Sequence, residues 1–206
     1  MSFTHRSDNS VLVIGNGPTV LDKLSLEIIS KYDVIVRINR GYFEGIEKHK
    51  EVIGTQTDYL YIHDGFCTNE WFTTRSVDFA STTLFLVVPN FKYSHGEALQ
   101  MNNKWIHLIP RQVEDDIKER YNFDSRWPTT GLECLLHLST YFEDITIVGF
   151  DNNTKEGFKH TNYHFYKHTD NRTMKDMQNK NRPDHKFLLE RQIVDDMIAK
   201  EIIKVL

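Results

Sequence analysis

The segment Val11–Thr19, with the sequence Val-Leu-Val-Ile-Gly-Asn-Gly-Pro-Thr, constrains the fold more than any other part of this chain. An apolar run leads directly into a turn with two glycines, and apolar residues then recur at helical spacing. This pattern predicts a buried strand, a tight turn and a helix. Such a turn can present backbone N–H groups to a phosphate, but it is as common as a purely structural connection. Val20 replaces the third glycine of the dinucleotide fingerprint and no Gly-Lys-Ser/Thr follows, so the type of nucleotide stays open.

Strand-like and helix-like segments alternate along the whole chain. Strands are predicted near residues 11–15, 33–38, 57–63, 83–89, 105–109 and 145–149, and helices at 18–30, 67–79, 111–121, 130–142 and 185–204. This alternation predicts an α/β fold over residues 1–206: a single-domain, Rossmann-like, mostly parallel sheet with helices on both faces. Residues 151–182 are polar and aperiodic, which is typical of a lid over a functional site or of a disordered segment.

The composition excludes several classes of protein. The 206 residues carry a formal net charge of −4 and 39% of them are hydrophobic, so we expect a globular protein without a nucleic-acid partner. The two cysteines, Cys67 and Cys134, form neither a disulfide framework nor a Cys-x-x-Cys metal pair. The sequence has no apolar signal region and no apolar run of membrane-spanning length, which predicts a cytoplasmic location. The oligomeric state stays open.

Polar residues follow several of the predicted strands and open one of the helices. Asn39 ends the second strand and can both donate to and accept from a sugar or a base, although a solvated strand end is an equal alternative. The hydroxyls of Pro128-Thr-Thr-Gly131 can cap the helix that follows or bind a ligand. Because ligands collect at the carboxyl ends of parallel strands, one crevice is predicted to be lined by Asn16, Asn39, Thr129, Thr130 and Phe150.

A histidine-rich cluster lies within the polar segment. It contains His160, His164 and His168, with Tyr163 and Tyr166 between them. The spacing of four is compatible with a metal site, but no glutamate follows the first histidine and no supporting acid is obvious. Contact with a phosphate is the better functional interpretation, and a solvated polar loop is the alternative.

A further candidate histidine opens the C-terminal helix. Asp184 is a candidate N-cap, which would place His185 in the first turn. A neutral imidazole there can take a proton from a hydroxyl group. Glu190 lies five residues further on, off the same helix face, so we expect it to orient a neighbouring residue and not to touch His185. An incidental histidine at a helix start is the commoner alternative.

Four short motifs in chain order resemble those of the sialyltransferases of glycosyltransferase family 29, over most of the chain from Val11 to Glu190. Val11–Asn39 resembles the large sialyl motif, and Pro128–Phe150 resembles the small one. His164-Phe-Tyr-Lys167 resembles the third motif except at its last residue, and His185-Lys-Phe-Leu-Leu-Glu190 matches the very small motif. The Gly-Asn-Gly-Pro turn and the small size are also similar to the bacterial sialyltransferases of family 42.

This resemblance implies a GT-A-like sialyltransferase fold and a metal-independent, inverting transfer of sialic acid from CMP-sialic acid to a sugar hydroxyl of a glycan. It implies no cofactor besides the nucleotide-sugar donor. His185 would be the general base, and His164 would stabilise the departing phosphate. The substrate-binding residues that it implies are Asn16, Gly17, Asn39, Thr129, Thr130, Gly131, Phe150, Tyr163 and Tyr166.

The chain departs from the animal members of the family, which join the large and small motifs by a disulfide. Val11 and Phe142 stand at those positions, and both are apolar residues that can pack. Together with the missing membrane anchor, this fits a bacterial or viral-type soluble enzyme. Two alternatives stay open. One is a transferase of another CMP-activated sugar acid such as Kdo, with loops at 64–80 and 90–104 selecting the acceptor; the other is a non-catalytic nucleotide- or glycan-binding module.

Overall fold

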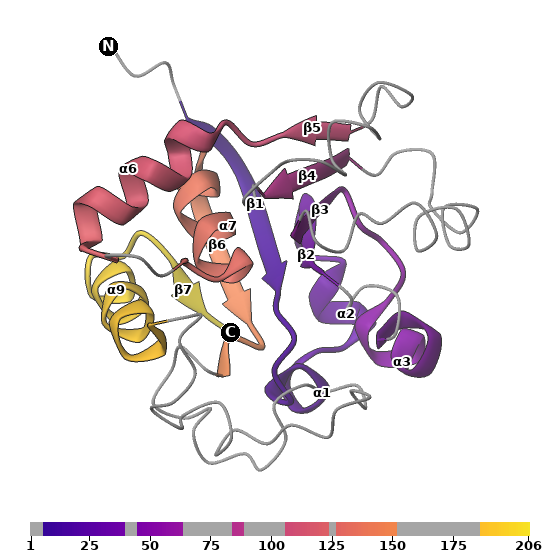
Figure 1. Ribbon diagram of the computed structural model, residues 1–206. Helices are drawn as coiled ribbons and strands as arrows, with labels where there is room; N and C mark the ends of the chain where they lie inside the picture. The colour runs from indigo at the N-terminus through magenta and orange to yellow at the C-terminus, as the bar shows by residue number, and fades with distance from the viewer. Residues whose placement is uncertain (1–5, 40–44, 64–83, 89–105, 124–126, 152–185) are drawn as a thin grey trace.

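A parallel β-sheet forms the centre of the molecule (Figure 1). The computed structural model describes residues 6–39, 45–63, 84–88, 106–123, 127–151 and 186–206. Within them, seven strands pair in the order β5-β4-β3-β2-β1-β6-β7, and every pairing is parallel. The strands are β1 (Ser7–Ile14), β2 (Val34–Ile38), β3 (Tyr59–His63), β4 (Leu84–Val88), β5 (Ile106–Leu108), β6 (Phe142–Val148) and β7 (Lys204–Val205).

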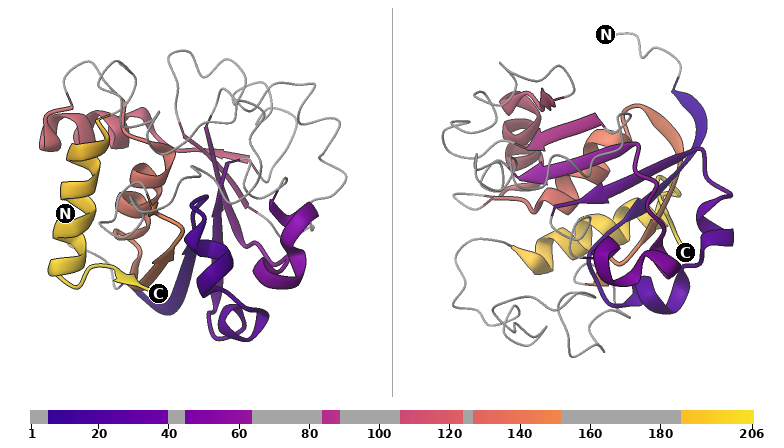
Figure 2. Two further views of the ribbon diagram at one scale, coloured as in Figure 1. Left: turned by 90° about the horizontal axis from the view of Figure 1, so that it is seen from below. Right: turned by 90° about the vertical axis from the view of Figure 1, so that its right-hand side faces the viewer.

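Helices cover both faces of this sheet (Figure 2). One face carries α1 (Thr19–Lys23), α2 (Leu26–Ile29) and α3 (Ile46–Ile53), and the other carries α6 (Arg111–Tyr121), α7 (Thr130–Leu138) and α9 (Phe187–Ala199). Successive strand residues point to opposite faces. Val11 and Val13 of β1 therefore pack with the second group of helices, whereas Leu12 and Ile14 pack with the first. The predicted α/β architecture is confirmed.

The helix predicted at 18–30 is two short helices. The cap of the second one explains the break: the Ser25 hydroxyl accepts from the backbone N–H of Ile28 at 3.3 Å. The helix predicted at 111–121 has those bounds. The helix predicted at 67–79 lies outside the described residues.

Two helix ends were predicted too late in the sequence. The helix predicted at 130–142 ends at Leu138, because the chain turns there and Phe142 already begins β6. The C-terminal helix runs over Phe187–Ala199, with Lys186 before it, so the predicted span of 185–204 is wrong at both ends. The last residues form β7 instead, because pairing with β6 satisfies their backbone groups.

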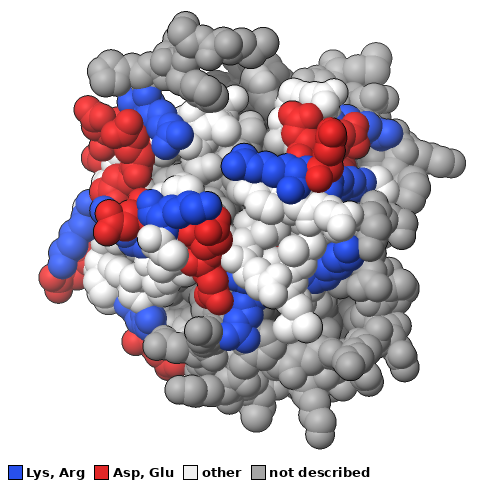
Figure 3. Space-filling view, turned by 90° about the vertical axis from the view of Figure 1, so that its left-hand side faces the viewer, with Lys and Arg blue, Asp and Glu red and all other residues white. Residues whose placement is uncertain are grey.

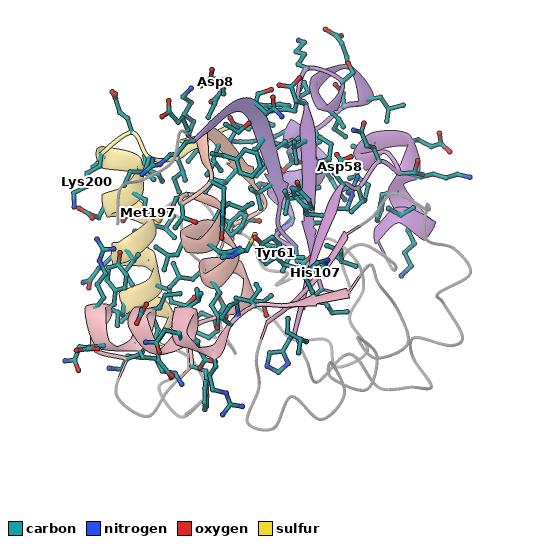
Figure 4. All side chains as sticks on the ribbon, turned by 90° about the horizontal axis from the view of Figure 1, so that it is seen from above. Asp8, Asp58, Tyr61, His107, Met197 and Lys200 are labelled. Atoms are coloured by element: carbon teal, nitrogen blue, oxygen red, sulfur yellow. The ribbon has the colours of Figure 1, made fainter. Side chains whose placement is uncertain are left out.

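The C-terminal helix packs one face on the sheet, as its periodicity predicts. Val194 and Met197 are buried, whereas Val205, directly after the predicted helix range 185–204, lies on β7 and is 45% exposed. Figure 4 shows Met197 on the inner side of α9 and Lys200 on its outer side. Acidic and basic side chains intermingle on the face that contains α6 and α9 (Figure 3). No helix in the described part of the chain combines the length and apolarity needed to cross a lipid bilayer.

Val11 and Phe142, the residues at which the resemblance implies a missing disulfide, lie on neighbouring strands. Val11 of β1 is fully buried, and Phe142 of β6 packs against the same hydrophobic core. The register pairs Val11 with Ile145 and Phe142 with Ser7. The expected apolar packing is therefore confirmed for both residues.

Candidate functional site

The strand order changes direction between β1 and β6. Strands β2 to β5 continue from one side of β1, whereas β6 and β7 lie on its other side. The crossovers after β1 and β2 use helices on one face, and those before β6 and β7 use helices on the other. In open α/β sheets, ligands bind outside the carboxyl ends of the strands at such a switch point. Asn16 and Gly17 follow β1 at this edge, and Phe150 follows β6.

The ends of β1 and β6 lie too close together for side chains at two positions. A Cβ on Gly15 would overlap the backbone of Gly149, and Gly149 has a φ of +72°. The backbone N–H of Gly15 donates to Val148, and that of Gly17 donates to Gly149 at 2.7 Å. These two N–H groups of the glycine turn therefore already have acceptors, which lie at the end of β6 and on Gly149 directly after it.

The carboxylate of Asp151 occupies the start of α1. It accepts the backbone N–H of Thr19 at 3.0 Å and also the Thr19 hydroxyl, and a Cβ on Gly17 would overlap it. Asp151 is buried, so the partial positive charge of the helix start is already matched by the protein's own anion. This arrangement favours the interpretation of the glycine turn as a structural connection and not as a phosphate-binding turn. The Asn16 side chain remains the candidate ligand-binding group of this turn.

Asn16 and Asn39 connect the ends of three neighbouring strands. Nδ2 of Asn16 donates to the carbonyl of Ile38 at 3.2 Å. Asn39 has a left-handed φ of 51°, and its Oδ1 accepts from the backbone N–H of His63 at 2.8 Å. Among the described residues, Oδ1 of Asn16 and Nδ2 of Asn39 have no partner. The pair thus offers one acceptor and one donor at the same sheet edge.

Arg37, one residue before Ile38, is not part of a solvated strand end. Its guanidinium is buried and donates to the carbonyls of Ile53 at 2.5 Å and Gly54 at 3.2 Å, at the end of α3. It also donates to the Thr57 hydroxyl at 2.9 Å. Helix carbonyls favour a cation there, so Arg37 fixes α3 to the sheet.

The start of α7 reaches the same edge. A Cβ on Gly131 would lie 3.2 Å from the ring of Phe150 and 3.9 Å from Ile38, so α7 packs closely on the ends of β6 and β2. Thr130 is 7% exposed and its hydroxyl makes no hydrogen bond among the described residues. Phe150 is also 7% exposed, which makes it mainly a packing residue beside Gly131.

Thr129 has a different role from its neighbour. Its hydroxyl accepts from the backbone N–H of Leu132 at 3.2 Å and so caps α7. Its own N–H and hydroxyl both donate to the carboxylate of Glu190 on α9. Both donors of Thr129 are therefore already used within the protein, whereas Thr130 and Gly131 follow it at the helix start. The expectation that Glu190 orients a neighbour is confirmed, and Thr129 is that neighbour.

Several predicted site residues lie outside the described part of the chain. These are Tyr163, His164, Tyr166 and His185, together with Asp184 and the loops at 64–80 and 90–104. The prediction that Asp184 caps the C-terminal helix is wrong, because the N-cap of α9 is Lys186 and His185 therefore precedes the helix in sequence. Among the described residues, no group of three or more potential ligands has the arrangement of a metal site.

The role of Asp151 was not predicted from the sequence, where this residue only begins the polar segment 151–182. The available signal was its position directly after a buried strand at the edge where β1 also ends. No local pattern could show that its partner would be Thr19, 132 residues earlier.

The fold defines a class of protein, the α/β proteins with a parallel sheet covered by helices on both faces, and comparison with solved structures identifies the fold more closely. One mammalian sialyltransferase, in complex with Gal-beta-1-3GalNAc-ortho-nitrophenol, matches with a TM-score of 0.65 and 14% identity over 97% of this chain and 70% of the other. A second mammalian sialyltransferase structure matches with a TM-score of 0.66 and 14% identity over 97% and 69%. The GT-A-like sialyltransferase fold is therefore confirmed. No family model and no curated protein sequence matches the chain.

Proposed function

We propose that this chain is a glycosyltransferase that transfers sialic acid from CMP-sialic acid to a sugar hydroxyl, without a metal ion and with inversion. The observation that carries this proposal is the convergence of the large-motif and small-motif residues at one sheet edge. Asn16 contacts the end of β2, and Gly131 packs against both Ile38 and Phe150. Those residues come from distant parts of a chain whose fold is that of the sialyltransferases.

The polar groups at this edge suit a cytidine monophosphate. Asn16 supplies an acceptor and Asn39 a donor, which a cytosine edge or a ribose hydroxyl can use. Thr130 and Gly131 lie at the start of α7, a nine-residue helix whose N-terminal dipole favours an anion. We assign the phosphate to Thr130 and Gly131 at this helix start, because Glu190 already accepts from the donors of Thr129 and Asp151 already accepts from Thr19 at the start of α1.

The proposed reaction needs a base and a group that stabilises the leaving phosphate. The acceptor hydroxyl gives its proton to His185 while its oxygen bonds to the anomeric carbon. The bond from that carbon to the phosphate oxygen breaks, and CMP leaves with its charge stabilised by His164 and the α7 start. Tyr163 and Tyr166 are proposed helpers on the donor side. Positioning and charge placement then supply most of the rate enhancement.

Isothermal titration and a donor screen test the proposal. We expect CMP to bind and NAD not to bind, because no third glycine and no ribose-binding acid follow β1 and β2. A panel of glycan acceptors incubated with CMP-sialic acid should give products heavier by one sialic acid in mass spectrometry. Transfer from CMP-Kdo alone would establish the other sugar-acid donor, and CMP binding without any transfer would establish a binding module. Binding of NAD without CMP would refute the nucleotide assignment.

A further inference from the structure

Two hydrogen bonds join α9 to the start of α7. Oε1 of Glu190 accepts from the backbone N–H of Thr129 at 2.8 Å, and Oε2 accepts from the Thr129 hydroxyl at 2.7 Å. The same hydroxyl accepts from the N–H of Leu132, the cap bond of α7. Glu190 therefore fixes the direction of the hydroxyl that caps α7, and it fixes the backbone immediately before Thr130.

Glu190 is completely buried, so water does not compete for these bonds. Burial raises the pKa of the carboxyl to about 7, and the two hydrogen bonds from Thr129 act in the opposite direction. A buried carboxylate destabilises the folded protein unless its hydrogen bonds are satisfied. The hydrogen bonds from Thr129 stabilise this buried carboxylate, so the two residues form one unit.

A second contact holds the same end of α9. Nζ of Lys186 donates to the carbonyl of Asn122 at 2.8 Å, directly after α6. The backbone N–H of Glu190 donates to the carbonyl of Lys186 at 2.9 Å. The start of α9 is thus fixed to α6 through its N-cap residue Lys186 and to α7 through Glu190. His185 immediately precedes Lys186 in the chain.

We propose that Glu190 is a positioning residue, which holds the first turn of α9 in register with the α7 start through Thr129. This inference rests on the proposed function. The nucleotide side of the site is the α7 start at Thr130 and Gly131, and the proposed base precedes α9. Rigid alignment of these two segments sets the distance between the acceptor hydroxyl and the donor. Displacements near 1 Å can cost about 100-fold in rate, even when their source is remote from the reacting atoms.

Four variants test the coupling. Glu190→Gln keeps the shape but replaces one carboxylate oxygen by an amide NH2 group, which cannot accept the hydrogen bond of the Thr129 hydroxyl. Thr129→Val keeps the shape but removes the hydroxyl. Thr129→Ser keeps both donors and should restore near-wild-type turnover. Glu133→Gln is the matched control, because Glu133 is also a buried carboxyl on α7, but its side chain makes no hydrogen bond to Thr129.

The kinetic result should separate positioning from simple binding. We expect Glu190→Gln and Thr129→Val each to lower kcat about 10-fold or more while CMP affinity changes less than about 3-fold. The double variant should be hardly worse than either single one, since both break one unit. Glu133→Gln should keep wild-type kcat. If the fold-decreases in kcat of the two single variants multiply in the double variant, the inference is wrong. It is also wrong if both single variants keep the wild-type kcat. Neither result would contradict the proposed transferase activity.

Amide hydrogen exchange provides a readout that does not depend on activity. Glu190→Gln should speed exchange at Thr129 and Leu132 on α7, and Thr129→Val should speed it at Glu190 on α9. If the wild type transfers no sugar, the proposed function fails and this reciprocal effect alone decides the coupling. Unchanged exchange across the partner helix in both variants would refute it. Glu190→Gln is used instead of Glu190→Ala, so that the coupling can be tested even if the alanine variant does not fold.

Discussion

The carboxylate of Asp151 caps α1 through Thr19, although 132 residues separate the two. It accepts the Thr19 N–H at 3.0 Å as well as the Thr19 hydroxyl, and its atoms lie where a side chain on Gly17 would have to be. The glycine turn after β1 is therefore closed by a residue that follows β6. This contact joins the two strands at which the sheet order changes direction.

Replacing Asp151 by alanine should lower the free energy of unfolding by about 1–2 kcal/mol, because α1 loses its cap. Asp151→Asn should lose less, since its amide oxygen can still accept one hydrogen bond. Urea unfolding midpoints measure both effects. Asp115→Ala, at an exposed position on α6, is the control and should change stability by less than about 0.5 kcal/mol. Equal effects at Asp151 and Asp115 would contradict the capping role.

Two substitutions of Asn39 should separate its contribution to stability from its contribution to nucleotide binding. Asn39→Ala should cost about 1–3 kcal/mol, because alanine is strained at a φ of 51° and the N–H of His63 loses its acceptor. Asn39→Asp keeps that acceptor but removes the amide donor and adds charge, so CMP affinity should fall about 10-fold or more. Asn122→Asp is the matched control, since Asn122 has a φ of 55° at the end of α6. Unchanged CMP affinity in Asn39→Asp would show that Asn39 does not bind the nucleotide.

Glu133→Gln should change how stability depends on pH. Burial raises the pKa of Glu133 well above its usual value, with smaller contributions from Glu114 and Glu190, and Lys118 lowers it. The unfolded chain loses this proton near pH 4.5, whereas the folded protein retains it. The stabilisation is therefore complete below that pH and is lost as the pH rises. The glutamine variant cannot titrate, so its urea midpoint relative to wild type should be higher at pH 8 than at pH 5. A constant difference between the two pH values would show that Glu133 is charged in the folded state.

Two histidine variants should distinguish the proposed base from the proposed phosphate contact. His185→Ala should lower kcat by about 10²–10⁴-fold with little change in CMP affinity, because it acts on the acceptor side. His164→Ala should weaken CMP binding as well as turnover. His107→Ala, an exposed position on β5, is the control and should behave as wild type. Near-wild-type turnover of His185→Ala would make His164 the next candidate for the base.

Transfer should survive treatment with EDTA. The adjacent acids Asp115 and Asp116 are the obvious pair for a divalent cation, but both are exposed on α6 and not at the strand ends. The α7 start and the histidines are proposed to stabilise the leaving phosphate in place of a metal ion. Loss of activity in chelator that Mg²⁺ or Mn²⁺ restores would show that a metal site exists.

Sequence periodicity predicted six strands of the sheet and the helix at 111–121, because burial of alternate or helically spaced side chains is a local property. It missed β7 and the early end of α7. The strand β7 depends on its pairing with β6, and the end of α7 depends on the start of β6, where Phe142 pairs with Ser7 of β1. Short segments of sequence do not encode such long-range pairing. The polar residues at strand ends were also predictable, since parallel strands present their carboxyl ends at one edge.

The tertiary structure alone decided what those polar residues do. Thr129 was predicted to touch the ligand, but it is paired with Glu190, and Arg37 is buried against the end of α3. Each hydrogen bond needs a partner at a defined distance and direction, and these partners lie far apart in the sequence. Burial of apolar surface is non-directional, so its pattern can be predicted from the sequence. The partner of a buried polar group is determined only once the chain has folded.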